Sequence, residues 1–212
     1  MEYKIIASGS KGNCVVINRL MVDCGISYKK LEKYLYKIDM LFLTHKHTDH
    51  VNKSTLNQII KYHPKIKIVC SKELKDYLKI DSLITVKNYT QYNIKLQDCD
   101  LMFQPFECIH NVTTQGIVFK YNDVHCIYAT DTNNLDNSYK CTFGDGLYDY
   151  FFIEANYDEY KLSAVNKNHY KYDVVKNARR HFSKQDSYDF YLLNRRSIDS
   201  EYIELHKSER FY

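Results

Sequence analysis

The sequence of 212 residues has no tryptophan, two prolines and six glycines. It contains no linker and no low-complexity segment, so we expect one domain over residues 1–212 with a substantial core. No apolar stretch approaches the roughly 20 residues of a membrane helix, and Met1–Lys4 does not begin a signal peptide. These absences exclude a helical membrane protein, and we expect no membrane partner.

The seven cysteines form no C-x-x-C pair, and their number is odd. A disulfide framework is therefore excluded, and we expect reduced thiols in a cytoplasmic protein. The net charge of +4 is too small to establish nucleic-acid binding. Basic residues do cluster late in the chain, either as a solvated face or as a substrate contact. They are Lys171, Lys176, Arg179, Arg180, Lys184, Arg195 and Arg196.

Apolar runs of strand length alternate with helical patterns in the first half, which is typical of α/β layering. Predicted strands cover Tyr3–Ala7, Cys14–Asn18, Leu20–Asp23, Met40–Leu43, Ile66–Cys70 and Leu83–Val86, with helices at Ser27–Ile38, Ser54–Tyr62 and Lys72–Leu78. In the second half, predicted strands cover Leu101–Pro105, Gly116–Tyr121, Val124–Ala129, Tyr150–Ile153 and Phe190–Leu193, with a helix at Asp173–His181.

One string indicates chemistry more strongly than any other. His45-x-His47-x-Asp49-His50 directly follows the apolar run Met40–Leu43. Alternate residues after a strand point the same way, so His45 and His47 can share one cation while Asp49 and His50 reach a second. A surface histidine run is the alternative, but a buried strand before it favours a metal site.

This string resembles the signature of the metallo-β-lactamase-fold hydrolases. Ser8–Cys14 and Val22–Ser27 resemble, within that superfamily, the small YycJ-type nucleases and, more distantly, ribonuclease Z and related phosphodiesterases. The resemblance extends from about Tyr3 to about Ser200. It implies an α/β fold with two similar halves, the four-layer αβ/βα sandwich.

The resemblance also implies two divalent cations, zinc or manganese, that share a carboxylate. His110 follows a predicted strand and resembles the family's next histidine ligand, and Asp131 resembles its bridging aspartate. An ordinary loop histidine and an Asx-turn are the alternatives for these two residues. The implied ligands are His45, His47 and His110 for one cation, Asp49 and His50 for the other, and Asp131 for both.

The family's last ligand is a histidine after the final strand. Here Phe190–Leu193 is followed by Asn194, which best matches the ligand position. A shift of one residue would place Arg195 there instead. An amide oxygen is a weak ligand for zinc, so we expect a loose second site, a preference for manganese, or a site that fills only with substrate. His206 is a less favoured substitute.

Glu154 and His181 resemble a carboxylate and histidine pair of the nuclease branch. A carboxylate at Glu154 that holds the His181 imidazole would favour its protonated form, a suitable donor to a leaving oxygen. The alternative for His181 is an exposed histidine before a helix, because Ser183-x-x-Asp186 has the pattern of a capping box.

These features predict a metal-dependent phosphodiester hydrolase acting on nucleic acid, in the manner of a DNA exonuclease, through a metal-bridged hydroxide. Asp49, His181 and Glu154 are the expected catalytic residues. The expected substrate contacts are Ser8, Asn13, Asn194, Arg195 and Arg196.

Three alternatives stay open for the function. They are a phosphodiesterase for cyclic nucleotides or other small molecules, a catalytically impaired metal-containing binding protein, and a lactam or thioester hydrolase. A homodimer is possible, but no specific interface is evident in the sequence.

Overall fold

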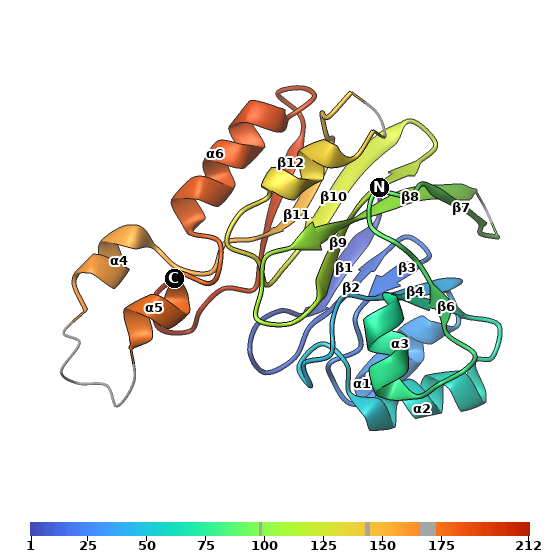
Figure 1. Cartoon of the computed structure of the whole chain (residues 1–212). Helices are drawn as coiled ribbons and strands as arrows, with labels where there is room; N and C mark the ends of the chain where they lie inside the picture. The colour runs from blue at the N-terminus through green and yellow to red at the C-terminus, as the bar shows by residue number, and fades with distance from the viewer. Residues whose placement is uncertain (98, 143–144, 166–172) are drawn as a thin grey trace.

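The computed structural model describes residues 1–97, 99–142, 145–165 and 173–212. Two six-stranded sheets face each other, one from each half of the chain (Figure 1). The described residues include no helix that is long and apolar enough to cross a membrane. None of the seven cysteines, all of which lie in the described part of the chain, forms a disulfide.

The first sheet has the strand order β1-β2-β3-β4-β5-β6, antiparallel from β1 to β3 and parallel from β3 to β6. Its strands are β1 (Tyr3–Ala7), β2 (Cys14–Ile17), β3 (Leu20–Val22), β4 (Met40–Leu43), β5 (Lys67–Cys70) and β6 (Ile84–Thr85). Three helices connect the parallel strands, namely α1 (Tyr28–Leu35), α2 (Lys53–Tyr62) and α3 (Lys72–Leu78). The predicted elements of this half are all present, with shifted ends for several.

The second sheet has the order β12-β11-β10-β9-β8-β7, with β10, β11 and β12 parallel. Its strands are β7 (Tyr92–Lys95), β8 (Asp100–Cys108), β9 (Thr114–Tyr121), β10 (Val124–Ala129), β11 (Tyr150–Glu154) and β12 (Glu201–Leu205). The remaining helices are the 3-10 helix η1 (Asp136–Lys140), α4 (Glu159–Ser163), α5 (Val174–Ala178) and α6 (Lys184–Asn194).

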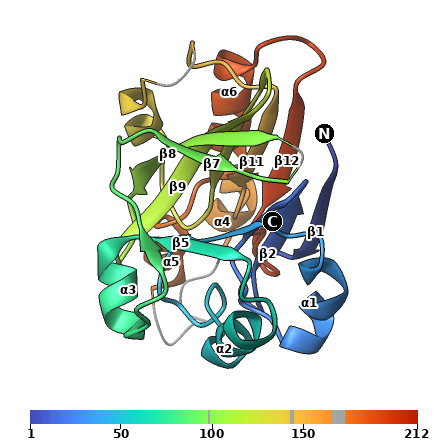
Figure 2. The ribbon, with the colours of Figure 1, turned by 90° about the vertical axis from the view of Figure 1, so that its right-hand side faces the viewer.

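Strand side chains alternate between two apolar environments. In β4, Met40 and Phe42 pack in the core between the sheets, while Leu41 and Leu43 pack against α1, α2 and α3. A strand buried on both faces needs apolar residues at every position, which explains its continuous apolar run. Figure 2 shows these three helices at one end of the view and α6 at the other.

The outer face of the second sheet is covered in the same way. Ile127 and Ala129 of β10 belong to a cluster with Phe190 and Tyr191 of α6. The layers are therefore helix, sheet, sheet and helix, which confirms the predicted four-layer αβ/βα sandwich.

The predicted strand Phe190–Leu193 is wrong, because these residues lie in α6. Ser183 caps this helix, since its hydroxyl oxygen accepts a hydrogen bond from the Asp186 amide at 3.0 Å. The Ser183-x-x-Asp186 pattern therefore indicated the start of a helix correctly, whereas the apolar run Phe190–Leu193 wrongly indicated a strand. The final strand is β12, whose Ile203 and Leu205 face the core.

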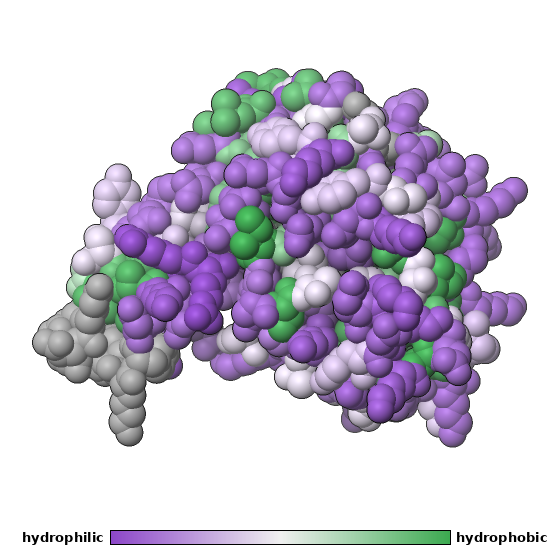
Figure 3. Space-filling model, in the orientation of Figure 1, coloured by the Kyte–Doolittle hydropathy of each residue, from purple (hydrophilic) through white to green (hydrophobic). Residues whose placement is uncertain are grey.

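Helices α4 and α5 lie together at one end of the molecule beside the C-terminus (Figure 1). Their contacts form a small separate apolar cluster, in which Leu162 and Val174 meet Tyr157 and Phe211. The face seen in Figure 3 is mainly hydrophilic, with apolar atoms scattered in small groups. Lys171 of the basic cluster lies outside the described residues.

Gly25, between β3 and α1, packs closely against the histidine-rich loop His45–His50. A Cβ atom there would lie 1.7 Å from the carbonyl oxygen of Asp49. We expect Gly25→Ala to displace this loop and to lower the free energy of unfolding by on the order of 3 kcal/mol. Denaturant unfolding measures the change.

Gly146→Ala is the matched control. No atom lies within 4 Å of its added Cβ, and only the φ of +75° opposes the change. It should cost about 1 kcal/mol. Equal losses in both variants would contradict the steric argument for Gly25.

Candidate metal centre

Five strands deliver ionisable side chains to one edge of the two sheets. His45 follows β4, His110 follows β8, Asp131 follows β10, Glu154 ends β11 and His206 follows β12. Ligands of α/β sheets bind outside the carboxyl ends of parallel strands, and β4, β10, β11 and β12 all meet here.

The first group consists of His45, His47 and His110, whose nearest ligand atoms lie within 4.8 Å of one another. His45 Nε2 and His47 Nδ1 are 2.9 Å apart, and His110 Nε2 is 3.4 Å from the same His47 nitrogen. Burial lowers the pKa of His45 to about 2 and that of His110 to about 4. Both imidazoles are therefore neutral at pH 7, which is the state that binds a metal.

The second group consists of Asp49, His50 and His206, and Asp131 lies between the two groups. Asp131 Oδ2 is 2.8 Å from His50 Nε2 and 3.6 Å from His206 Nε2. Its Oδ1 is 3.6 Å from His110 Nε2 of the first group. Burial raises the pKa of Asp131, but the charges of His206 and His50 outweigh burial and hold it well below its usual value.

The backbone at two of these residues is left-handed. Asp131 has φ of 55° and His206 has φ of 53°. Non-glycine residues adopt this conformation rarely, at a cost of order 1–3 kcal/mol, and it is concentrated at functional sites. The left-handed backbone lets the Asp131 and His206 side chains leave the ends of β10 and β12 in the direction of the other candidate ligands.

Asp23 orients His50. It is a buried carboxylate to which the sequence alone assigned no role. Asp23 Oδ2 is 2.6 Å from His50 Nδ1, and Asp23 also accepts hydrogen bonds from the Thr44 amide and hydroxyl. A carboxylate on Nδ1 leaves Nε2 to face the ligand site. Asp23 directly follows β3 and belongs to the Val22–Ser27 motif, and this position was the sequence feature that could have indicated its role.

The two expected substrate contacts near the N-terminus bind protein groups instead. Asn13 is buried, and its side chain bonds the Gly9 backbone and approaches His50 Nε2 at 2.9 Å. Ser8 Oγ accepts a hydrogen bond from the His206 amide at 2.7 Å. Both residues therefore position ligands, and the prediction that they contact substrate directly is not supported.

The other three expected substrate contacts lie at the opposite end of β11 from Glu154. Arg196 Nη2 bonds Asp145 Oδ1 at 2.7 Å, and Asn194 Nδ2 donates to Tyr139 Oη at 3.0 Å. Arg195 lies over the Tyr191 ring of α6. The structure thus corrects the assignment of Asn194, because His206 occupies the position expected for the last ligand.

Glu154 joins the metal centre to His181. Its Oε1 atom is 2.8 Å from both His181 Nδ1 and His206 Nδ1, and its Oε2 atom accepts a hydrogen bond from the Thr132 amide. Burial lowers the pKa of His181, but the Glu154 carboxylate outweighs it and raises the value to about 9. The structure therefore brings together the predicted pair and makes His181 a cation at neutral pH.

The donor set fits divalent cations. His206 Nε2 is buried and has no hydrogen-bond partner among the described residues, and the ring nitrogens of His45 and His47 face each other. Imidazole and carboxylate groups in this arrangement are typical ligands of zinc and of similar transition metals.

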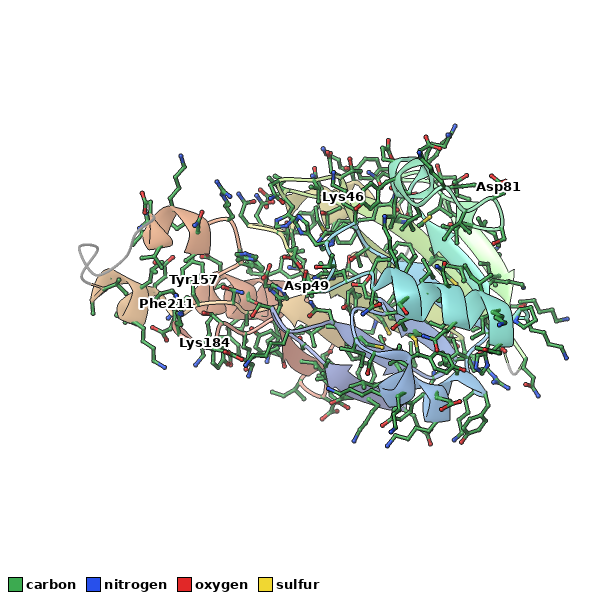
Figure 4. The ribbon with its side chains drawn as sticks, turned by 90° about the horizontal axis from the view of Figure 1, so that it is seen from below. Lys46, Asp49, Asp81, Tyr157, Lys184 and Phe211 are labelled. Carbon is green, nitrogen blue, oxygen red and sulfur yellow. The ribbon has the colours of Figure 1, made fainter. Side chains whose placement is uncertain are left out.

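A cleft of about 330 Å³ opens over this centre. Its wall includes Asn177 of α5 and Arg180 just after this helix, as well as Ser10, Asn111 and His181. Figure 4 shows Asp49 near the middle of the molecule, between Tyr157 and Phe211 at the α4–α5 end and the rest of the sandwich. Arg180 was predicted only as one member of a basic cluster, and its proximity to the centre depends on tertiary structure.

Comparison with known proteins identifies the family. Residues 18–179 match the model of the beta-lactamase superfamily domain, and the chain belongs to this family, as its motifs indicated. Comparison with curated proteins found no significant match. The family and the clustered ligands define a metallo-hydrolase with potential sites for divalent metals.

Solved structures share the fold over nearly the whole chain. Human tRNase Z, short form, has a TM-score of 0.73 at 17% identity, covering 99% of this chain and 94% of its own. The metallo-beta-lactamase fold protein YhfI from Bacillus subtilis has a TM-score of 0.67 at 16% identity, covering 98% and 86%. CmlA beta-hydroxylase has a TM-score of 0.58 at 16% identity, covering 91% of this chain and 43% of its own.

The placement of His206 leads to a test of metal stoichiometry. We expect His206→Ala to reduce bound zinc from about two ions per chain to about one, because one ligand of the second group is lost. Asn194→Ala is the control and should keep both. Elemental analysis after dialysis measures the ratio, and loss of metal in the Asn194 variant alone would contradict the assignment.

Proposed function

We propose that this protein is a metal-dependent phosphodiester hydrolase that acts on nucleic acid. The observation that supports it most is the Glu154–His181 pair beside the metal ligands. His181 Nδ1 is 3.8 Å from Asp131 Oδ1, and its imidazole is partly exposed to the cleft. A centre that only held a structural metal would not need a protonated imidazole at this place.

Each polar group has a defined part in this proposal. His45, His47 and His110 would hold one cation and Asp49, His50 and His206 the other, with Asp131 available to both groups. Divalent cations bound there supply a water of lowered pKa and neutralise charge on phosphoryl oxygens. Asp49 orients the attacking water or accepts its proton.

His181 donates a proton to the leaving oxygen. Its pKa of about 9 keeps it protonated at pH 7, and Glu154 fixes the ring by its bond to Nδ1, which leaves Nε2 as the donor. Arg180 lines the same cleft and supplies a fixed positive charge for a phosphate.

Hydrolysis of a small phosphodiester is the second candidate. The net charge of +4 and the small cleft suit a cyclic nucleotide as well as a polymer. Added salt separates the two cases, because polymer cleavage weakens steeply with salt and turnover of a small ligand does not. The argument for a catalytically impaired protein depended on a missing ligand, and the position of His206 beside Asp131 speaks against it.

Metal dependence is the first test. We expect metal-free protein to hydrolyse bis-(p-nitrophenyl) phosphate only after addition of Zn²⁺ or Mn²⁺. Asp131→Ala should lower the rate by more than about 100-fold, because both cation sites lose a carboxylate. Wild-type protein that binds metal but shows no turnover with either ion would overturn the proposal.

The role of His181 predicts a dependence on the leaving group. His181→Ala should lower kcat for an oligonucleotide by about 10²- to 10⁴-fold, because the departing alkoxide needs a proton. The effect on bis-(p-nitrophenyl) phosphate should stay below about tenfold, since nitrophenolate leaves without protonation.

The pH profile checks the same role. Only the protonated imidazole can donate, so wild-type kcat for the oligonucleotide should fall as pH rises through about 9. This limb should be absent in His181→Ala. An equal loss on both substrates, with the limb retained, would show that His181 does not act as the acid.

A further inference from the structure

A second cavity, of about 350 Å³, lies beside the metal centre. Lys46, Asn111 and Thr113 form the side nearest the centre, and Glu73, Leu74 and Tyr77 of α3 form the other side. Lys46 stands between His45 and His47 in the chain, and Asn111 follows His110. Asn111 also lines the cleft over the metal ligands, so the two hollows are adjacent.

Tyr77 is an exposed tyrosine that lines this cavity and is contacted by lysines from two other segments. Its exposed fraction is 45%, and Lys53 Nζ and Lys46 Nζ lie 4.3 Å and 5.5 Å from its ring centroid. Lys53 belongs to α2, and Lys46 belongs to the histidine-rich loop. The ring is therefore a partly exposed π surface with two lysine ammonium groups over it.

Two other exposed tyrosines, Tyr36 and Tyr62, pair with lysines that are their neighbours in sequence, Lys37 and Lys61. Such a pair forms by proximity alone and lines none of the hollows described above. At Tyr77, three separate segments are required to assemble the same contact. This assembly next to a metal centre indicates a binding surface.

The charges of the residues around this cavity favour a base inside it and phosphates at its rim. Glu73 is exposed on the wall, and its carboxylate opposes a phosphate inside the cavity. The Glu73 carboxylate and the Asn111 amide offer acceptors and a donor to the edge of a base. The ammonium groups of Lys46 and Lys53 are placed for phosphates at the rim.

We propose that this cavity binds the nucleobase adjacent to the scissile phosphate, stacked on Tyr77. This rests on the proposed function and narrows its substrate to single-stranded nucleic acid, because a base must leave its duplex to stack on a side chain. Lys46 and Lys53 swing from the ring to the flanking phosphates when the base enters.

The direct test is binding of a short single strand to the zinc-loaded protein. The probe is a fluorescein-labelled hexathymidylate with slowly hydrolysed phosphorothioate links, measured by anisotropy. Tyr77→Ala should raise Kd by about 5- to 100-fold, the range for loss of one base-stacking contact. Tyr77→Phe should stay within about twofold, because the ring is kept.

The matched control is Tyr36→Ala, which removes a tyrosine with an exposed fraction of 72% and a neighbouring lysine. It should leave Kd unchanged. A blunt DNA duplex provides the second comparison, since its stacked bases cannot reach Tyr77 and the Tyr77→Ala effect should be absent.

A pair of small esters separates this inference from the proposed hydrolysis. Tyr77→Ala should raise KM about tenfold for p-nitrophenyl thymidine-5′-phosphate and leave that of methyl p-nitrophenyl phosphate unchanged, because only the first carries a base.

Each combination of results has a definite meaning. Turnover of both esters with no effect of Tyr77→Ala on KM or Kd overturns the base subsite and leaves the hydrolase. Weaker strand binding in Tyr77→Ala, with no turnover of either ester, keeps the subsite and overturns the hydrolase. No measurable binding of the strand by wild-type protein also overturns the subsite.

Discussion

The buried carboxylate of Asp131 is the interaction on which the rest of the site depends. Its oxygens lie 2.8 Å from His50, 3.6 Å from His110 and His206, and 3.8 Å from His181. A buried negative charge is costly unless positive groups or metals compensate it. Four imidazoles on separate parts of the chain therefore converge on one anion, and the same convergence makes a place for cations.

Glu154 contacts two histidines that differ in exposure. Its Oε1 atom lies 2.8 Å from His206 Nδ1 and from His181 Nδ1. Against the effect of burial, the carboxylate helps to raise the pKa of both imidazoles, whereas burial prevails at His45 and His110 and lowers their pKa. His206 is buried among the candidate ligands and His181 is partly exposed to the cleft, so position and environment together distinguish these histidines.

The scaffold explains why this arrangement is possible. Both sheets are covered by helices on their outer faces, so a central strand such as β4 is apolar at every position. The carboxyl ends of β4, β10, β11 and β12 meet at one edge, and the loops that follow them carry the polar residues of the site. Asp23, Thr44 and Asn13 then fill the space behind His50 with hydrogen bonds, which holds the ligand before any cation arrives.

Local pattern by itself determined much of this protein. The apolar run Met40–Leu43 predicted the strand that ends just before His45, and the family resemblance singled out Asp131 and Glu154, which lie at predicted strand ends. These strand ends could be predicted because each depends on residues a few positions apart.

Only the tertiary structure decided the rest. His206 joins the centre because β12 pairs in parallel with β11, a contact between segments about fifty residues apart that no local pattern encodes. Asn194 was placed wrongly because an apolar run of four residues suits a helix as well as a strand, and packing against the sheet made it a helix. Arg180 and Tyr77 likewise lie near the centre because of how distant segments pack. Their residue types alone do not show which other segments they will meet in the folded chain.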